Sequence, residues 1–223
     1  MKSLSTAVVA VLLGGGIEST SLVRRFLDAG RRVVPVHVAC GLLWDAAEAW
    51  HVRRFCEANR APGLEPLIEI DLPLHSFLHG HWAVSGVGVP QAGAAAAELE
   101  IPLRNLTLLG FAVHRLQRYA NAALAIGTTA DNSYADGSRD YFNRCEAVLS
   151  LEAGRPLEIL TPYITWNKTR VIRETPAATL ALSFSCVHPQ GTQHCGTCIK
   201  CGRRRQAFET AGVSDPTEYI ATG

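Results

Sequence analysis

The chain alternates between short runs rich in apolar residues and longer stretches in which apolar residues recur every three or four positions. Runs of the first kind predict strands that are buried on both faces, as in a parallel sheet. They fall at 7–13, 32–38, 66–71, 124–127 and 157–160. Stretches of the second kind predict helices, from about Ser19 to Gly30 and over 45–59, 105–121, 140–151, 167–174 and 202–211. Because strands and helices alternate, we expect an α/β fold in which an open parallel sheet carries helices on both faces.

Two segments depart from this regular alternation. The helix predicted at 105–121 is rich in apolar residues, and we expect it to be buried at the centre of the domain. The segment from 72 to about 102 has no regular period, and an irregular segment of that length is usually functional or mobile in a compact domain. An active-site lid and a dimer contact are both open for it. At the start of the helix 45–59, Asp45 is a suitable N-cap.

The composition fits one sizeable core. The chain has 223 residues, of which 48% are apolar and 18% charged, without an internal repeat or a low-complexity block. We divide it into a main α/β domain at 1–184 and a small C-terminal unit at 185–223 that packs on it. The formal net charge of +1 argues against a large basic surface, so we expect no direct nucleic-acid partner. The one dense basic run, 203–205, fits either a solvated helix face or a phosphate clamp.

The sequence predicts neither a membrane segment nor a secretory signal. The apolar run at 7–13 is short for a signal peptide and ends in three glycines without a clear cleavage site. No stretch approaches the roughly 20 apolar residues that cross a bilayer. We therefore expect a cytoplasmic protein without a membrane partner, in which clustered cysteines bind metal more often than they form disulfides.

A run of three glycines, Gly14 to Gly16, joins the first predicted strand to the first predicted helix. Glycines let the backbone turn tightly and approach a ligand, and the helix that follows offers free N–H groups and a positive dipole end to an anion. Ser19 and Thr20 add hydroxyl donors. Open parallel sheets bind ligands at this carboxyl edge, although a plain tight turn is the alternative. The segment matches neither GxGxxG nor the Walker pattern.

Four of the seven cysteines cluster near the C-terminus in the pattern CX8CX2CX2C. They are Cys186, Cys195, Cys198 and Cys201. Four thiolates at this spacing bind one tetrahedral zinc ion, and a site closed by four protein ligands is structural rather than catalytic. The metal would fold a segment that is too polar to make its own core. Free or redox-active cysteines are the alternative, and His188 and His194 stand close enough in sequence to replace a ligand.

The other cysteines, Cys40, Cys56 and Cys145, fall at a strand end or on predicted helices and are most simply small apolar residues. Cys40 follows the second predicted strand, so it can also line a nucleotide pocket at the carboxyl edge of the sheet.

The glycine turn resembles the SGGxDS loop with which PP-loop ATP pyrophosphatases, a Rossmann-like group, hold the pyrophosphate portion of ATP. Gly15, Gly16 and Ser19 match that pattern. Gly14 stands in place of the family's serine, which removes a hydroxyl, and Glu18 stands in place of its aspartate, which lengthens the acidic side chain. The resemblance implies ATP binding and leaves the rate of turnover open.

The order of motifs along nearly the whole chain resembles the 7-cyano-7-deazaguanine synthase family. The segments PLRN (102–105), GTTADNSYAD (127–136) and TWNK (165–168) are similar to the family's P-x-R-N, G-x-N-A-x-D-x-S-x-Y-P-D and L-T-K segments, and the cysteines have the family's spacing. Two segments differ from the family's motifs. GLLW at 41–44 replaces a Gly-Gln-Arg-His type segment, and DGS at 136–138 replaces Asp-Cys-Arg. The chain therefore looks like a divergent member of this family.

The resemblance implies an ATP-dependent carbon–nitrogen ligase of queuosine biosynthesis. In this reaction ATP activates 7-carboxy-7-deazaguanine as an acyl adenylate, ammonia gives an amide, and a second ATP converts the amide to the nitrile of 7-cyano-7-deazaguanine. Two alternatives stay open. One is a related ligase that adenylates a carboxylated deazapurine, or another carboxylic acid, and transfers it to a different amine on a small molecule or a protein. The other is a nucleotide-binding module without turnover.

The resemblance also implies roles for individual residues. The expected ATP-binding residues are Leu13, Gly14, Gly15, Gly16, Ser19, Thr20 and Cys40. The expected catalytic residues are Lys168 as the cation on the phosphates, Arg104 on the substrate carboxylate or a phosphate, and Glu18 as a ligand of Mg²⁺. The expected substrate-binding residues are Arg104, Asn105, Asp131, Tyr134 and Asp136. The alternatives are an exposed lysine for Lys168, a structural ion pair for Arg104, and a turn or helix cap for Asp136. Structural zinc, Mg²⁺ with ATP, free ammonia and a homodimer complete the expectation.

Overall fold

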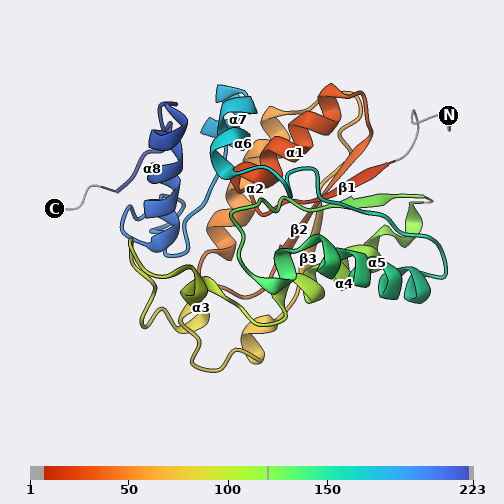
Figure 1. The fold of residues 1–223 in the computed structure, drawn as a ribbon, viewed down its shortest axis with the longest axis horizontal. Helices are drawn as coiled ribbons and strands as arrows, with labels where there is room; N and C mark the ends of the chain where they lie inside the picture. The colour runs from red at the N-terminus through yellow and green to blue at the C-terminus, as the bar shows by residue number, and fades with distance from the viewer. Residues whose placement is uncertain (1–7, 120, 221–223) are drawn as a thin grey trace.

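A parallel sheet of five strands runs through the protein in the computed structural model, which describes residues 8–119 and 121–220 (Figure 1). The strands are β1 (Val9–Leu12), β2 (Val33–Ala39), β3 (Ile68–Asp71), β4 (Ala123–Ala125) and β5 (Ile159–Leu160). Their order across the sheet is β3-β2-β1-β4-β5, and every neighbouring pair is parallel. All five predicted strands are confirmed, although residue 7 of the first lies outside the described residues. The order reverses between β1 and β4, so the crevice in which open α/β sheets bind ligands lies beside the carboxyl end of β1.

The helices follow in the predicted order. They are α1 (Ile17–Asp28), α2 (Asp45–Ala58), α3 (Trp82–Ser85), α4 (Arg104–Arg115), α5 (Arg139–Ala153), α6 (Lys168–Glu174), α7 (Ala177–Ala181) and α8 (Ile199–Ala211). Short 3-10 turns lie at 74–76, 96–99, 116–118 and 135–137. The helices predicted at 45–59, 140–151 and 167–174 are confirmed to within two residues at each end. The sequence pattern predicted neither α3 nor α7, which have four and five residues.

Both faces of the sheet are covered because consecutive residues of β1 are apolar and point to opposite sides. Val9 and Val11 belong to the core formed with α1, α2, α6 and α7. Ala10 and Leu12 belong to the core formed with α4 and α5. Figure 1 shows α1, α6 and α7 on one side of the strands and α4 and α5 on the other. The expected open parallel sheet with helices on both faces is therefore confirmed.

The helix expected at 105–121 differs from the prediction in length and in burial. α4 ends at Arg115 and a 3-10 turn follows, while residue 120 lies outside the described part of the chain. Its buried residues are Leu108, Leu109, Ala112 and Val113. Leu106 and Phe111 each remain 44% exposed. The expectation of a central buried helix was wrong, because α4 is an amphipathic helix that covers one face of the sheet.

Asp45 is not the N-cap of α2, as the sequence suggested. Trp44 occupies that position and Asp45 is the first helical residue. The Asp45 carboxylate accepts a hydrogen bond from the N–H of Leu42 at 2.9 Å. The side chain therefore closes the turn between β2 and α2, and it keeps a negative charge at the positive end of the helix dipole.

The segment 72–102 packs on the rest of the protein over much of its length. It contains α3 and two 3-10 turns. The indole of Trp82 stacks on that of Trp44, with ring centroids 5.7 Å apart. The N–H of Ala92 donates to the carbonyl of Thr197, between two of the clustered cysteines, at 2.8 Å. These contacts join the segment to α2 and to the C-terminal unit, and its role as a lid or a dimer contact stays a prediction.

The C-terminal unit shares its packing with the main domain. Cys186, Val187 and Cys198 lie in the same buried cluster as β1 and β2, while Phe208 of α8 belongs to the cluster on the opposite face of the sheet. The boundary between 184 and 185 stays a prediction. Among the described residues, no helix is both long and apolar enough to cross a membrane.

Candidate functional site

The glycine turn lies at the carboxyl end of β1, where the strand order places a ligand site. β1 ends at Leu12, and α1 begins at Ile17 with Gly16 as its N-cap, two residues earlier than predicted. Gly15 has a φ of +73°, a left-handed conformation that favours glycine. Its carbonyl oxygen accepts from the N–H of Phe184 at 2.8 Å, which anchors the turn. The free N–H groups of the first turn of α1 therefore lie at the sheet edge, where an anion can bind.

The hydroxyl groups of Ser19 and Thr20 support this turn. Ser19 Oγ donates to the carbonyl oxygen of Gly16 at 3.1 Å, and Thr20 Oγ1 is 3.0 Å from the same oxygen. Thr20 and Leu13, the residue before the glycines, are both buried. In this conformation the two hydroxyls shape the turn, and their contacts with ATP stay predictions.

Lys168 reaches the glycine turn from α6, and its Nζ lies 2.8 Å from Oε1 of Glu18. The start of α6 is fixed by two side chains. Asn167 caps the helix by accepting from the N–H of Arg170, and the Asp131 carboxylate accepts from the N–H of Lys168. Burial by itself raises the pKa of Glu18, but the charge and hydrogen bond of Lys168 outweigh it and hold this pKa below its usual value. An ionised carboxylate and an ammonium thus lie together at the carboxyl edge of the sheet.

Lys200 lies within electrostatic reach of this pair, and Arg104 lies within reach of Lys200. Arg104 opens α4, and its Nε is buried without a hydrogen-bond partner among the described residues. Lys200 lies in the first turn of α8 and keeps contact with solvent. Desolvation and the positive charge of Lys168 nevertheless lower the pKa of Lys200 to about 8. The negative charge of Glu18 opposes this decrease. The sequence analysis missed Lys200 because nothing in a CIKC segment shows that α8 points its first turn toward α1.

Glu48 of α2 contacts the first glycine of the turn. A Cβ added to Gly14 would lie 3.6 Å from Oε1 and 3.7 Å from Oε2 of Glu48. Desolvation raises the pKa of Glu48 to about 8, and Arg104 opposes this rise while the negative charge of Asp45 adds to it. Sequence reasoning also missed this residue, because a glutamate within an amphipathic helix ordinarily faces solvent.

The other residues expected to bind substrate gather where α4 begins. Asn105 Nδ2 donates to the carbonyl oxygen of Asp136 at 3.3 Å. The Tyr134 hydroxyl donates to a carbonyl of the 3-10 turn at 96–99. Desolvation raises the pKa of the Asp136 carboxyl, and the charge of Arg104 opposes the rise. Arg104, Asn105, Tyr134 and Asp136 therefore form one group, whereas Asp131 lies at the start of α6. Their contacts with a substrate stay predictions.

The other three cysteines are free thiols. Cys40 and Cys145 are buried, and Cys56 is partly buried. Desolvation raises the pKa of Cys40 to about 11 and that of Cys56 to about 12, so both are neutral thiols. The Cys40 thiol makes a weak hydrogen bond to the carbonyl of Val38 at 3.8 Å. A contact between Cys40 and the nucleotide stays a prediction.

The four clustered cysteines converge on one point. The sulfur atoms of Cys186, Cys195, Cys198 and Cys201 all lie within 4.8 Å of one another, and all four residues are buried. The Cys186 sulfur is 3.6 Å from that of Cys195 and 3.9 Å from that of Cys198, and the Cys195 and Cys201 sulfurs are 4.0 Å apart. Four sulfurs at about 2.3 Å from one tetrahedral ion are about 3.8 Å apart. The arrangement therefore fits a single metal ion.

The polar residues near the cysteines have structural roles. His194 Nε2 accepts from the N–H of Ser185 at 3.0 Å, so this nitrogen is already used. Arg204 is only 2% exposed, and its guanidinium donates to Thr217 Oγ1 at 2.6 Å and to Ser185 Oγ at 3.2 Å. For Arg204, both interpretations of the basic run were wrong, since its guanidinium is neither solvated nor directed at a phosphate. Arg203 of the same run is exposed.

The structure most informative for the fold is that of the U34-tRNA thiolase NcsA from Methanococcus maripaludis, solved with its [4Fe-4S] cluster. The two chains superpose with a TM-score of 0.53 at 14% sequence identity, over 95% of this chain and 70% of the thiolase. At that identity the likeness supports the fold alone.

Curated relatives carry the name 7-cyano-7-deazaguanine synthase. The protein from Methanoculleus marisnigri is 27% identical over 220 residues, which cover 93% of this chain and 96% of the relative. The protein from Sulfurisphaera tokodaii is 29% identical over 95% of this chain, but the chain spans only 47% of that longer relative. The family profile described as Queuosine biosynthesis protein QueC matches residues 7–212, which is most of the sequence. The chain therefore belongs to the QueC family of queuosine biosynthesis proteins.

Proposed function

We propose that the chain is an ATP-dependent carbon–nitrogen ligase that converts 7-carboxy-7-deazaguanine and ammonia into 7-cyano-7-deazaguanine. The observation that carries this proposal is the pairing of Lys168 with Glu18, 2.8 Å apart, beside the first turn of α1. A helix N-terminus, a lysine and a carboxylate at the carboxyl edge of the sheet are the groups that bind and polarise the phosphates of ATP. The name of the relatives supports the choice of product.

In the first half of the proposed reaction, a carboxylate oxygen of the substrate attacks the α-phosphorus of ATP and pyrophosphate leaves. The N–H groups between Gly14 and Ser19 and the ammonium of Lys168 take up the negative charge that develops on the pyrophosphate. Arg104 orients the substrate carboxylate, because a guanidinium binds a carboxylate through two parallel hydrogen bonds. The product is an acyl adenylate, from which water must be kept away.

In the second half, ammonia attacks the acyl carbon and AMP leaves, which gives the amide. The amide oxygen then attacks the α-phosphorus of a second ATP, and pyrophosphate leaves again. Loss of AMP and of both N–H protons of the amide nitrogen leaves the nitrile. Asn105, Tyr134 and Asp136 hold the ring during both halves, with the Asp136 carboxylate accepting from the N–H groups of the guanine-like edge.

Two metals belong to the proposal. Mg²⁺ would enter with ATP, and Glu18 is the ionised carboxylate nearest to the phosphate-binding turn that could hold it. Zinc is proposed for the four cysteines, where it would stabilise the fold. The sulfur spacing of 3.6 to 4.0 Å supports a single ion, because a four-iron cluster would hold its cysteine sulfurs farther apart.

The proposal is tested by incubating the metal-loaded protein with ATP, Mg²⁺, ammonium and 7-carboxy-7-deazaguanine and following the products by mass spectrometry. We expect nitrile and AMP. Replacing Lys168 with glutamine should lower the rate by about a hundredfold or more, the usual effect of removing one transition-state donor. Arg144→Gln is the matched control, because Arg144 pairs with Asp140 on the exposed face of α5. ATP that binds without yielding AMP would reject the proposal.

A related ligase with a different amine acceptor is the second candidate. It is favoured by Gly137, which stands where the family has a cysteine: a Cβ there would lie 2.4 Å from Nδ2 of Asn132. A side chain at this position would displace Asn132, so the substrate region differs locally from the family's. The same assay without ammonium, supplemented in turn with small amines and with protein amines, separates the candidates. Adduct formation only with such an amine supports the second candidate.

We further propose a homodimer in the cytoplasm without direct contact to nucleic acid. The exposed apolar residues Leu106 and Phe111 on α4 and Val148 and Leu151 on α5 supply a surface for the dimer. The near-neutral charge of the chain supports the absence of a nucleic-acid partner. Sedimentation of the protein, alone and with Phe111→Ser, tests the dimer contact.

A further inference from the structure

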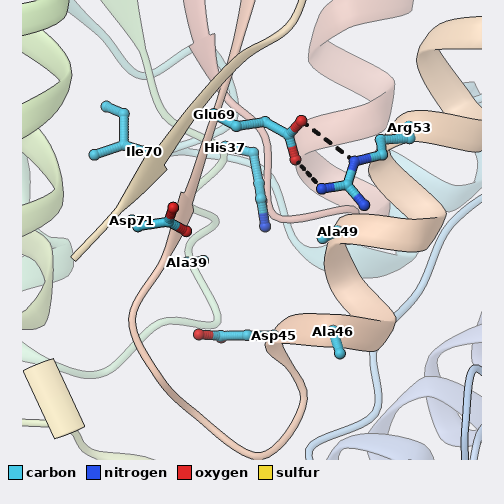
Figure 2. Close-up of a pocket in the computed structure, with 9 residues that line it drawn as sticks. All are labelled: His37, Ala39, Asp45, Ala46, Ala49, Arg53, Glu69, Ile70 and Asp71. Atoms are coloured by element: carbon cyan, nitrogen blue, oxygen red, sulfur yellow. Dashed lines mark hydrogen bonds and ion pairs between the residues drawn. The ribbon is translucent and has the colours of Figure 1, made fainter. Parts of the chain in front are cut away.

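A cavity of about 250 Å³ opens between α2 and the carboxyl halves of β2 and β3 (Figure 2). Its polar lining consists of His37, Asp45, Arg53, Glu69 and Asp71. Alanines of β2 and α2 line the rest of it together with one isoleucine, and their small side chains leave the space open. None of these polar residues has a part in the function proposed above.

His37 distinguishes this cavity from a plain surface depression. The side chain is 1% exposed, and its Nδ1 lies 3.0 Å from the carbonyl oxygen of Leu13. Since a carbonyl can only accept, Nδ1 carries the proton and Nε2 is left with a lone pair. Nε2 is buried without a partner among the described residues, and Figure 2 shows the ring pointing into the cavity. Buried polar atoms in proteins nearly always have a hydrogen-bond partner, and a bound ligand can supply the donor that this nitrogen lacks.

The remaining polar groups of the cavity require the same kind of ligand. Arg53 is the one strong donor in the lining, and it is bound to Glu69 through Nε at 3.2 Å and Nη2 at 2.7 Å. Asp45 and Asp71 add carboxylates that can only accept when ionised. The cavity therefore presents an imidazole lone pair and two carboxylates. Asp71 lies within electrostatic reach of the Arg53 guanidinium, but that guanidinium is already hydrogen-bonded to Glu69.

A single metal ion does not fit these acceptors. Within the described part of the chain, only the four cysteines bring three or more ligand atoms together closely enough for one ion. The space beside His37 instead suits a molecule of several heavy atoms. We propose that the cavity binds a small organic cation whose protonated amine donates to Nε2 of His37 and is neutralised by Asp45 and Asp71. Because His37 also holds Leu13, the residue before the glycine turn, this ligand and ATP should affect each other's affinity.

The proposal is tested by titrating the full-length protein, labelled with ¹⁵N in its histidines, with n-butylamine and with 1-butanol at constant ionic strength. The two probes have matched chains and differ in the ammonium. We expect butylamine alone to shift the Nε2 resonance of His37 and to saturate. Asp71→Asn, an exposed residue at the end of β3, should weaken butylamine binding about fivefold to tenfold. Asp140→Asn on α5 is the control and should leave the affinity unchanged.

Two results would overturn the proposal. One is an equal response to the amine and the alcohol, or equal affinities for the Asp71→Asn and Asp140→Asn proteins, since then charge does not recognise the ligand. The other is direct competition by adenosine, which would assign the cavity to the base of the nucleotide. The titration involves no turnover, so its outcome is independent of the ligase activity proposed above.

Discussion

Gly127→Ala tests whether the loop after β4 positions the glycine turn for which phosphate binding is proposed. Gly127 packs against the first turn of α1. A Cβ added there would lie 2.8 Å from Cβ of Glu18, 3.0 Å from its carbonyl carbon and 3.1 Å from the backbone nitrogen of Ser19. Two of these three atoms belong to the backbone, so a side-chain rotation cannot relieve the contact. Either the first turn of α1, which carries the N–H groups proposed to bind the phosphates, or the loop at Gly127 has to shift.

The size of the effect follows from two opposing terms. Forcing one extra methyl group into a packed site costs about 1–3 kcal/mol. Replacing glycine by alanine recovers about 0.4–1 kcal/mol by restricting the unfolded chain. At the midpoints of these ranges the net loss in the free energy of unfolding is about 1.3 kcal/mol, which lowers the melting temperature of a chain of this length by roughly 3–5 °C.

Differential scanning calorimetry of Gly127→Ala and Gly110→Ala measures this difference. Gly110 lies inside α4, and a Cβ there meets nothing within 4 Å. Its replacement should raise the free energy of unfolding by about 0.5–1 kcal/mol, the helix preference of alanine over glycine. Titration calorimetry should show weaker ATP binding only for Gly127→Ala. The reasoning is refuted if Gly127→Ala keeps both its melting temperature and its ATP affinity, or if both variants lose stability equally.

Three further predictions concern the C-terminal unit and His37. Arg204→Met should lower the free energy of unfolding, measured in urea, by about 3 kcal/mol, because it leaves Asp215 without its buried partner. The control is Arg203→Met at an exposed position, which should have little effect. Equal losses for the two variants would contradict the prediction. Metal removal by a chelator should lower both the melting temperature and the ATP affinity, because the N–H of Phe184, two residues before Cys186, donates to the carbonyl of Gly15 in the glycine turn. An unchanged ATP affinity after metal removal would contradict this coupling. Burial lowers the pKa of His37 below 6.5, so unfolding takes up a proton and stability falls as the pH drops below about 6.5, by at most about 1.4 kcal/mol per pH unit. His37→Gln should remove that part of the slope, and an identical pH profile for the variant would count against it.

The sheet could be predicted because its strands are buried on both faces. In β1 the residues Val9, Ala10, Val11 and Leu12 are all buried, and a short unbroken apolar run that ends in glycines is typical of a strand inside a parallel sheet. The burial of α4 could not be predicted in the same way. Leu106 and Phe111 are as apolar as the buried residues beside them, and only the packing of α4 against the sheet and α5 decides which face is covered.

The residues of the candidate site likewise differ in whether the sequence could predict them. The glycine turn and the cysteines are local patterns, so the sequence alone indicated both. Glu48, His37 and Arg204 act through partners distant in sequence: His37 through Leu13, and Arg204 through Ser185 and Thr217. Nothing in the segments around these residues marks them. Their environment arises only when α2, β1 and α8 come together, so it needed the structure.

The two departures from the SGGxDS pattern belong to one local arrangement. The carboxyl group of Glu48 lies beside Gly14, with its oxygens 3.6 and 3.7 Å from where a Cβ would be, which is ordinary van der Waals contact. The place of the missing serine hydroxyl is thus next to a carboxyl group whose pKa is raised to about 8, so that it can donate as well as accept at neutral pH. Glu18 spans the gap to Lys168, whose backbone N–H is held by Asp131, so the longer acidic side chain forms an ion pair with the ammonium at 2.8 Å. Each departure therefore has a neighbour that the sequence pattern does not include, Glu48 beside Gly14 and Lys168 beside Glu18.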